Sequence, residues 1–281
     1  MEAEKVSQSF YLEIKPAGSF IRIDFKEIWR FRELFYAFSW RDIKVRYKQT
    51  ALGVAWAIFQ PFLMMLIFSV FFGRLINVPS DGVPYPVFVF CGLLFWNYFS
   101  SALNNASNSL TGNVGMIQKV YFPRLILPFS STITPVIDYL FSFIVFIGLM
   151  FYYHITPTFL GLVVTPLLVL IAFICSTGIG LFFASANVKY RDVRFILPFF
   201  IQLFMFVTPV IYPVSIIPAR FQWVSYLNPM SGVISAARSS FFGATPVDWM
   251  ALLISIGISL LILILGVYYF NKTERFFADV I

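Results

Sequence analysis

The stretch WRDIKVRYKQTALGVAWAIFQPFLMMLIFSVFF, residues 40–72, passes with hardly a break from a basic helical pattern into a long apolar run. On a helical wheel, segment 25–48 separates an aromatic and apolar stripe from a charged face. The stripe contains Phe25, Ile28, Trp29, Tyr36, Trp40, Ile43 and Tyr47, and the charged face carries Lys26, Arg30, Glu33, Arg41, Lys44 and Lys48. This pattern is typical of a helix in the headgroup layer of a membrane. A helix packed on a soluble domain is the weaker alternative, because about twenty apolar residues follow directly, as many as a bilayer crossing needs.

The composition is that of a membrane protein. Of the 281 residues, 59% are hydrophobic and 20% aromatic, whereas a soluble domain is roughly 45–50% apolar. Because a backbone in lipid must satisfy its own hydrogen bonds, we expect an all-α integral membrane protein. The net charge of +7 does not indicate a nucleic-acid partner, since the cations lie beside apolar runs.

Six apolar runs are long enough to be predicted as membrane spans: residues 51–72, 87–110, 127–153, 159–186, 195–212 and 249–270. The N-terminal region, the loops after the second and fourth predicted spans, and the tail carry all but three of the 20 Lys and Arg residues. The exceptions are Arg74, Arg220 and Arg238. This positive-inside bias places both termini in the cytosol. The first fifty residues also lack the short apolar core of a secretory signal, which agrees with a cytosolic N-terminus.

The predicted organisation has three parts. Residues 1–49 form a cytosolic N-terminal region with the amphipathic helix and a short extended segment near residues 10–23. Residues 50–271 form the six-span domain, and residues 272–281 form a cytosolic tail in which Asn271 caps a short helix, with Glu274 as its reciprocal partner.

The segment between the fifth and sixth spans, residues 210–246, is apolar and aromatic but broken by prolines. A water-exposed loop would rarely be this apolar, so we expect two short re-entrant helices in the outer leaflet, where a broken backbone is tolerated if protein covers it. A folded cap on the external membrane surface is the alternative.

The sequence lacks the parts of a catalyst. It contains no G-x-x-x-x-G-K-[ST] phosphate loop, no plausible Ser/His/Asp set and no pair of acids in one span. Cys91 and Cys175 lie in apolar runs and His154 is the single histidine, so we predict neither a disulfide framework nor a metal site. We therefore expect no enzyme activity and no cofactor on this chain.

Asp138 is the one acid inside a predicted span, roughly 16 Å from its start at 1.5 Å per residue. An intramembrane carboxylate is a functional candidate because it is costly unless it is partnered. No cationic partner is evident from the sequence. A structural hydrogen bond, a channel-lining role and proton coupling all stay open.

Several aromatic residues are candidates for lining a path through the membrane. A polysaccharide presents flat C–H faces that slide over aromatic rings. The candidates are Trp56, Phe59 and Phe62 in the first span, and Tyr212, Trp223 and Tyr226 at the external mouth. For any one ring, contact with lipid or packing is the alternative.

The cytosolic connection TGNVGMIQKVYFPRLILP, residues 111–128, contains glycines and a proline around a predicted short helix at about 113–125. We expect Tyr121 and Phe122 to be exposed between Lys119 and Arg124. Exposed aromatic and arginine side chains on a short element favour a docking contact over a plain surface connection.

Four motifs in this order resemble one family: WRDIKVRYKQTALGVAWAIFQP, QKVYFPRLILP, YPVSIIP…YLNPMSGVISAAR and the terminal FADVI. They are similar to the membrane-spanning permease subunit of bacterial ABC-2-type polysaccharide exporters, which serve O-antigen, capsule and teichoic acid. The resemblance covers residues from about 34 to 281.

The resemblance implies an inner-membrane homodimer bound to two copies of a separate ATPase, which would hold ATP and Mg²⁺. Residues 116–124 then correspond to the coupling helix, with Met116, Lys119, Tyr121, Phe122 and Arg124 as contact residues. Residues 25–48 correspond to the interface helix, and 211–242 to the elements that close the external exit. The substrate would be a glycan on undecaprenyl diphosphate, and Arg41, Lys44, Arg46 and Lys48 are our candidates for attracting the diphosphate.

Rival functions remain at this stage. A related ABC-2 permease could carry teichoic acid or a small amphiphile such as a drug. An ion-coupled transporter would depend on Asp138 and not on ATP, and a membrane-embedded transferase would turn over alone.

Overall fold

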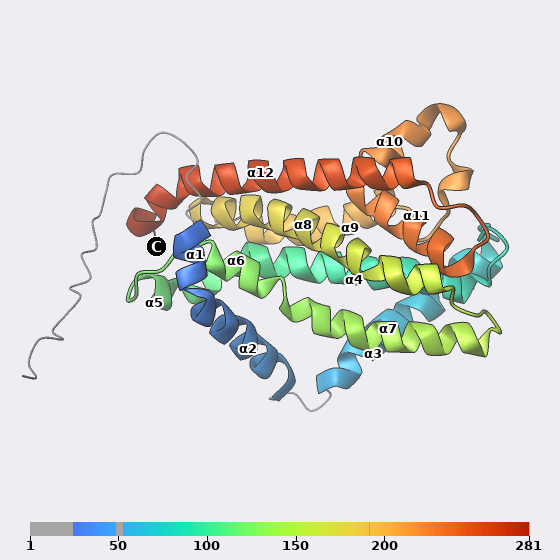
Figure 1. The fold of residues 1–281 in the computed structure, drawn as a ribbon, viewed down its shortest axis with the longest axis horizontal. Coiled ribbons are helices and arrows are strands. Elements are labelled where there is room, and N and C mark those ends of the chain that lie inside the picture. The colour runs from blue at the N-terminus through green and yellow to red at the C-terminus, as the bar shows by residue number, and fades with distance from the viewer. Residues whose placement is uncertain (1–24, 49–52, 191, 281) are drawn as a thin grey trace, which may run out of the picture.

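The computed structural model describes residues 25–48, 53–190 and 192–280, and these residues form helices and no strands (Figure 1). The extended segment expected near residues 10–23 lies outside the described residues. The first half of the helices comprises α1 (Phe25–Arg30), α2 (Arg32–Lys48), α3 (Gly53–Phe68), the π-helix η1 (Ser69–Leu75), α4 (Tyr85–Asn108), η2 (Thr111–Asn113), α5 (Val114–Ile117), α6 (Ile126–Ser131) and α7 (Thr134–Tyr152). The second half comprises α8 (Phe159–Lys189), α9 (Val193–Val207), η3 (Val214–Ile216), η4 (Ala219–Phe221), α10 (Gln222–Tyr226), α11 (Pro229–Phe242) and α12 (Trp249–Val280).

Five of the described helical segments are long and apolar enough to cross a membrane. They lie in α3 with η1, α4, α6 with α7, α8, and α12, so the chain is a multi-pass membrane protein. The predicted fifth span corresponds to α9, whose 15 residues extend about 22 Å at 1.5 Å per residue, short of the roughly 30 Å hydrocarbon core. The count of six spans therefore stays a prediction.

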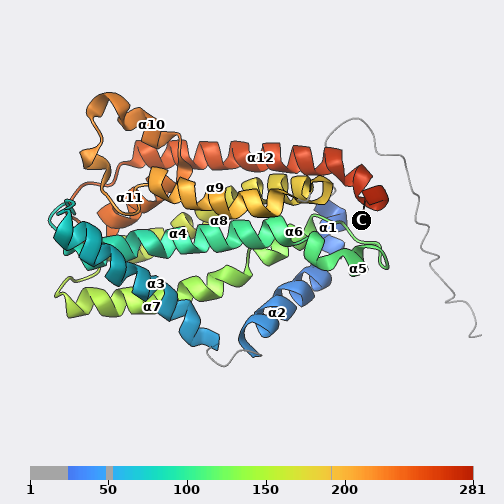
Figure 2. The ribbon, with the colours of Figure 1, turned by 180° about the vertical axis from the view of Figure 1, so that it is seen from behind.

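The path of the chain requires α9 to return it along the bundle. Gly178 of α8 faces Leu263 and Gly266 of α12, and the Phe182 ring lies 4.7 Å from the Tyr269 ring. Residue numbers rise together along both helices, so α8 and α12 are parallel. Between two parallel helices the chain must run back along the bundle, and Figure 2 shows α9 lying along the bundle between them in the sequence.

The helix α4 forms the centre of the bundle. Its side chains pack against α3, α7, α8 and α11, and most of them are buried. An aromatic contact links its neighbours, since the Phe146 and Phe241 rings of α7 and α11 meet edge to face with centroids 5.2 Å apart. The central position of α4 brings residues from four other helices to its faces.

The third apolar run is broken between α6 and α7 for a local reason. Pro135 has no N–H group, which frees the carbonyl of Ser131 four residues earlier. The side-chain amide of Asn105 in α4 donates to that carbonyl at 3.4 Å. The break is thus satisfied from a neighbouring helix.

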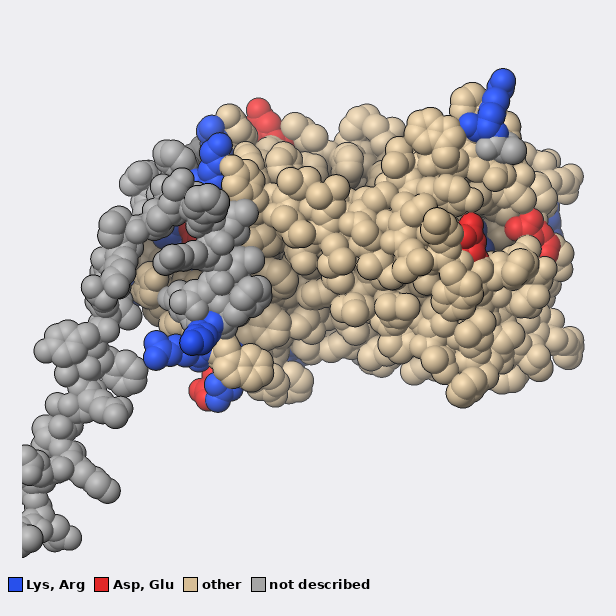
Figure 3. Space-filling model, turned by 45° about the horizontal axis from the view of Figure 1, so that its top comes forward, with Lys and Arg blue, Asp and Glu red and all other residues tan. Residues whose placement is uncertain are grey.

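The two ends of the bundle differ in charge. We call the end with α1, α2, α5 and the end of α12 the basic end, and the end with α10 and the starts of α8 and α12 the far end (Figure 1). Figure 3 shows Lys and Arg gathered toward the basic end of the visible face and an uncharged band across its middle. This distribution agrees with the predicted orientation, which stays a prediction.

At the far end, α11 packs between α4, α8 and α12. The Asn228 side chain caps the helix by accepting from the backbone N–H of Met230, Pro229 occupies the first turn, and Gly243 ends it in the left-handed conformation at φ 64°. Most of α11 is buried in protein, although re-entry into the bilayer stays a prediction.

The expectation for the tail was wrong in one respect. Asn271 does not begin a new helix, because α12 continues without interruption from Trp249 to Val280. Phe277 is fully buried, and its ring lies 5.5 Å from the ring of Phe270, which precedes it in the same helix. Packing of this helical face keeps the tail in line with the span.

The close contact of α8 and α12 gives a testable prediction. A Cβ atom added at Gly266 would lie 2.2 Å from the Gly178 carbonyl oxygen, so Gly266→Ala must push the helices apart. We expect a loss of about 1–3 kcal/mol in stability, measured as a lower midpoint of thermal unfolding in detergent. The matched control is Gly257→Ala on the same helix, where a Cβ atom meets nothing within 4 Å. Equal midpoints for both variants would contradict the packing argument.

Candidate functional site: the basic end and a polar cavity

A buried cluster of apolar side chains ties the basic end together. Five members show its extent: Phe38 of α2, Phe122 of the connection after α5, Leu181 of α8, and Phe270 and Phe277 of α12. The Phe38 and Phe122 rings lie 5.6 Å apart in an edge-to-face arrangement. Helices far apart in sequence therefore share one packed interior at this end.

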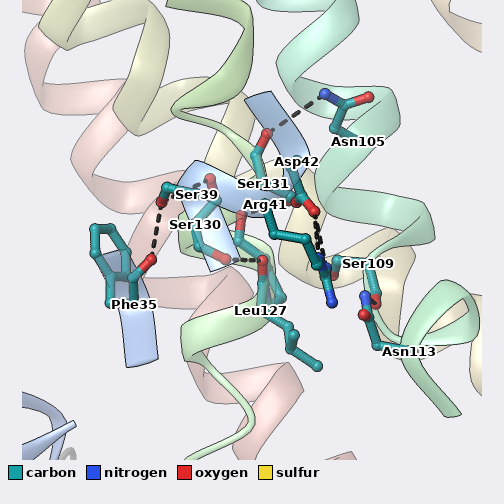
Figure 4. Close-up of polar contacts among 11 residues, drawn as sticks. Phe35, Ser39, Arg41, Asp42, Asn105, Ser109, Asn113, Leu127, Ser130 and Ser131 are labelled. Carbon is teal, nitrogen blue, oxygen red and sulfur yellow. Dashed lines mark hydrogen bonds and ion pairs between the residues drawn. The ribbon is translucent and has the colours of Figure 1, made fainter. Parts of the chain in front are cut away.

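Polar contacts beside this cluster fix α2 against α6 (Figure 4). The Ser39 hydroxyl donates to the backbone carbonyl of Phe35 at 3.0 Å and approaches that of Ser130 at 3.5 Å. Ser130 and Ser131 donate to carbonyls within α6, at Leu127 and Pro128. The hydroxyl groups at this junction are thus satisfied, which permits close packing of α2 on α6.

The residues predicted to couple to a partner are divided between surface and interior. The helix is shorter than the predicted 113–125, because only η2 and α5 are helical there. Tyr121 is 69% exposed and Lys119 is also exposed. The expectation that Phe122 is exposed was wrong: it is 4% exposed and packs on Phe38.

Two further predicted coupling residues make contacts within the chain. Met116 packs partly buried against the cluster. The Arg124 guanidinium donates to the backbone carbonyl of Glu274 at 2.8 Å and lies 5.8 Å from the centre of the Phe277 ring. Arg124 therefore holds the end of α12 beneath the connection.

Asp138 has the cationic partner that the sequence did not reveal. Its Oδ2 lies 2.5 Å from Nη2 of Arg46, and its Oδ1 accepts a hydrogen bond from the Tyr47 hydroxyl at 2.5 Å. Burial, and then the hydrogen bond and charge of Asp138, raise the pKa of Tyr47, so its hydroxyl remains protonated and donates. Two consecutive residues of α2 thus hold one carboxylate of α7.

The four cations predicted to attract a diphosphate have different surroundings. Arg41 pairs with Asp42 at 2.8 Å, and Arg46 pairs with Asp138. The Lys44 ammonium lies 5.4 Å from the centre of the Trp40 ring, and Lys48, at the end of α2, has no acidic partner among the described residues. Of the four, Lys44 and Lys48 therefore have no neutralising carboxylate in the part of the chain that the structure describes.

A partly open cavity of about 300 Å³ lies between α2, α3, α4 and α7. Apart from two tyrosines, its polar lining consists of Arg46, Gln60, Asn97, Ser100, Ser101, Asp138 and Ser142. The rings of Trp56, Tyr98 and Tyr139 also line it. A set of hydrogen-bonding groups of this density is unusual inside an apolar bundle.

Of the six aromatic residues predicted to line a path, Trp56 alone lines this cavity among the described residues. Its ring lies 6.0 Å from that of Phe59, and both are about half exposed, whereas Phe62 packs on the main core. At the far end, the Tyr212 hydroxyl donates to backbone carbonyls at the end of α9, Tyr226 donates to Asp248 at 3.4 Å, and Trp223 is 59% exposed. The structure does not bring the six rings together within one protomer.

Sequence reasoning missed the part played by Arg238, which it counted only as an external cation. Arg238 is 7% exposed, and its guanidinium donates to the carbonyls of Pro209 at 2.7 Å, Val210 at 2.6 Å and Tyr212 at 3.3 Å. The Tyr85 hydroxyl donates to the remaining carbonyl of this turn, that of Ile211, at 2.8 Å. A buried turn needs such donors for its carbonyls.

Comparison with known proteins decides the family. A family model described as ABC-2 type transporter matches residues 33–242. The chain belongs to this family. An O-antigen export system permease protein RfbA from Klebsiella pneumoniae is 28% identical to it over 250 residues, covering 89% of this chain and 95% of the relative.

Two further relatives are similar to this chain. An O-antigen export system permease protein RfbA from Myxococcus xanthus is 28% identical over 259 residues, 90% of this chain and 97% of the relative. The polysialic acid transport protein KpsM from Escherichia coli is 30% identical over 210 residues, 71% of this chain and 78% of the relative. The matches thus extend over most of this ABC-2 chain.

The ion pair between α2 and α7 predicts non-additive mutations. Asp138→Asn and Arg46→Gln each leave a charged partner without its counterion, so we expect each to lower stability by about 1–3 kcal/mol. The double variant should lose less than the sum of the two, measured by unfolding midpoints in detergent. Additive losses would show that the two side chains are independent.

The contacts of Arg238 predict that its substitution lowers stability far more than substitution of an exposed arginine at the same end. Arg238→Met leaves buried carbonyls without donors, and we expect a loss of about 3 kcal/mol or more. Arg220→Met, at an exposed position of the same end, should change stability by about 0.5 kcal/mol or less. Proteolysis and thermal unfolding of both variants test this difference. A tolerated Arg238→Met would refute the role of its hydrogen bonds.

Proposed function

We propose that this chain is the membrane subunit of an ATP-driven exporter that moves a lipid-linked polysaccharide, of the O-antigen type, from the cytosol across the inner membrane. The observation that carries the proposal is the match over about nine-tenths of the chain to relatives named as O-antigen export permeases. The polar cavity with its aromatic wall supports it, since sugars offer both hydroxyl groups and apolar C–H faces.

The proposed complex contains two copies of this chain and two copies of a cytosolic ABC ATPase. The chain itself has no phosphate loop, so ATP and Mg²⁺ belong to the ATPase in this proposal. Tyr121 and Lys119 form the exposed part of the docking contact with the ATPase. When the ATPase moves this contact, Phe122 transmits the movement to the buried cluster. Both termini lie in the cytosol, and undecaprenyl diphosphate is the proposed carrier of the glycan.

The same proposal gives the unneutralised cations of α2 a role in binding the carrier lipid. Lys44 and Lys48 at the end of α2 attract the diphosphate, since the other two candidate cations are neutralised by Asp42 and Asp138. Alternatives that keep the family are a permease for teichoic acid or for a small amphiphile. The KpsM relative, named for polysialic acid transport, favours a sugar polymer over a drug.

The test is movement of lipid-linked glycan in vesicles that contain this chain with and without its cognate ATPase. We expect movement to need both proteins and ATP. Tyr121→Ala should lower the rate about tenfold or more, as expected for loss of an aromatic anchor, while the ATPase keeps its basal hydrolysis. The control is Tyr152→Ala, which removes an exposed tyrosine at the far end.

Two results would contradict the proposal. Movement without ATP that is abolished by Asp138→Asn would indicate an ion-coupled transporter. Chemical turnover of the lipid-linked glycan by this chain alone would indicate a membrane-embedded transferase.

A further inference from the structure

We propose that the cavity between α2, α3, α4 and α7 is a binding subsite for a neutral, hydroxyl-rich segment of the transported glycan. The inference rests on the proposed function and adds to it a ligand chemistry and a set of residues. The diphosphate of the carrier is bound elsewhere in this proposal.

Along the helix axes the cavity lies within the apolar stretch of the bundle, and it is partly open, since Gln60 is exposed. Gln60 is about 10 Å from the start of α3, and Asn97 is about 18 Å from the start of α4, at 1.5 Å per residue. Both side chains line the cavity. Amide groups at such positions are costly unless they meet protein, water or ligand.

Part of the polar lining of the cavity has no hydrogen-bond partner among the described residues. The side-chain amides of Gln60 and Asn97 make no hydrogen bond to any other described residue. Tyr98 and Tyr139 are 2% and 4% exposed, and their buried hydroxyls have no partner in the described part of the chain. Buried donors and acceptors are normally satisfied. Gln60 and Asn97 therefore present hydrogen-bonding capacity to whatever occupies the cavity, whereas the two tyrosine hydroxyls are covered by protein.

The charges of the cavity favour a neutral ligand. Arg46 and Asp138 are the charged lining residues, and they lie 2.5 Å apart. A diphosphate would have to displace Asp138 from Arg46 and would lie beside that carboxylate. A sugar hydroxyl can accept from the Arg46 guanidinium and donate to the Asp138 carboxylate without separating them.

The aromatic wall and the volume agree with a short sugar segment. Trp56 is 54% exposed and lines the cavity, so one face of a sugar ring can pack on it while the hydroxyls reach the amides. The volume of about 300 Å³ is at the lower end of the usual range for ligand sites, roughly 300–1,000 Å³. The cavity thus fits part of a polymer.

The decisive experiment compares two lipids bound to the complete transporter complex in nanodiscs: bare undecaprenyl diphosphate, and undecaprenyl diphosphate that carries a neutral oligosaccharide. We expect the wild type to bind the glycosylated lipid about tenfold more tightly, as expected for a few additional hydrogen bonds. Asn97→Leu and Gln60→Met should each remove most of this preference without changing the affinity for the bare lipid. The control Asn104→Leu lies on the same helix, where its side chain contacts Asn108 instead of the cavity.

The outcomes separate the inference from the proposed function. A wild type that binds neither lipid contradicts the exporter itself. A wild type that binds both lipids equally, or variants that keep the preference, overturn the subsite and leave a cavity that holds only water. Variants that lose both lipids equally assign the cavity to the diphosphate, which also overturns the inference.

A cysteine variant tests the subsite by chemical labelling of the folded complex, so that a misfolded Asn97→Leu or Gln60→Met variant cannot be mistaken for a lost subsite. Cys91 and Cys175 are fully buried, so Asn97→Cys introduces a thiol that a hydrophilic thiol reagent can label selectively. We expect labelling that the glycosylated lipid slows about tenfold and the bare lipid does not. Absence of labelling in the folded complex, or equal slowing by both lipids, would refute the subsite.

Discussion

A carboxylate inside an apolar bundle needs a partner, and Asp138 has two consecutive ones from α2, Arg46 and Tyr47. This contact joins an amphipathic helix at the basic end to a membrane helix. It also neutralises the charge of the cavity between α2, α3, α4 and α7. One interaction thereby sets the position of α2 and the chemistry of the space beside it.

At the basic end, exposed and buried side chains follow each other in the connection between α5 and α6. Tyr121 is exposed, whereas the next residue, Phe122, is packed on Phe38 of α2. In the proposed docking contact, a displacement of the backbone at Tyr121 also acts on Phe122, since the two residues are adjacent and the interior around Phe122 is close-packed. The buried cluster connects Phe122 to α2 and to the end of α12, which Arg124 contacts, so in our proposal it passes the displacement on to both.

The sequence predicted the apolar helices well because length and hydropathy alone decide whether a segment can cross a bilayer. It failed where a partner far along the chain decides the outcome. Asp138 and Tyr47 are 91 residues apart, and Arg238 binds carbonyls of a turn on another element. Local patterns carry no information on such pairs. The capping signal at Asn271 was overridden by the packing of Phe277, and the boundary of α9 depends on the turn that Arg238 fixes.

Arg46, which is exposed, and Arg238, which is buried, show how the same side chain can be stabilised in different ways within one bundle. Arg46 is neutralised by a carboxylate, whereas Arg238 keeps its charge among backbone carbonyls and the face of the Phe88 ring, 3.5 Å away. Arg238 contacts Phe88 of α4, and the cavity that Arg46 lines includes Asn97, about 13 Å further along the same helix. The turn at 209–212 is therefore fixed to one half of α4 while the neutral cavity opens beside the other half. The central helix thus carries a fixed turn near one end and, near its middle, the Asn97 amide, which has no partner among the described residues. It separates the part of the chain that must hold its shape from the part that, in our proposal, binds the glycan.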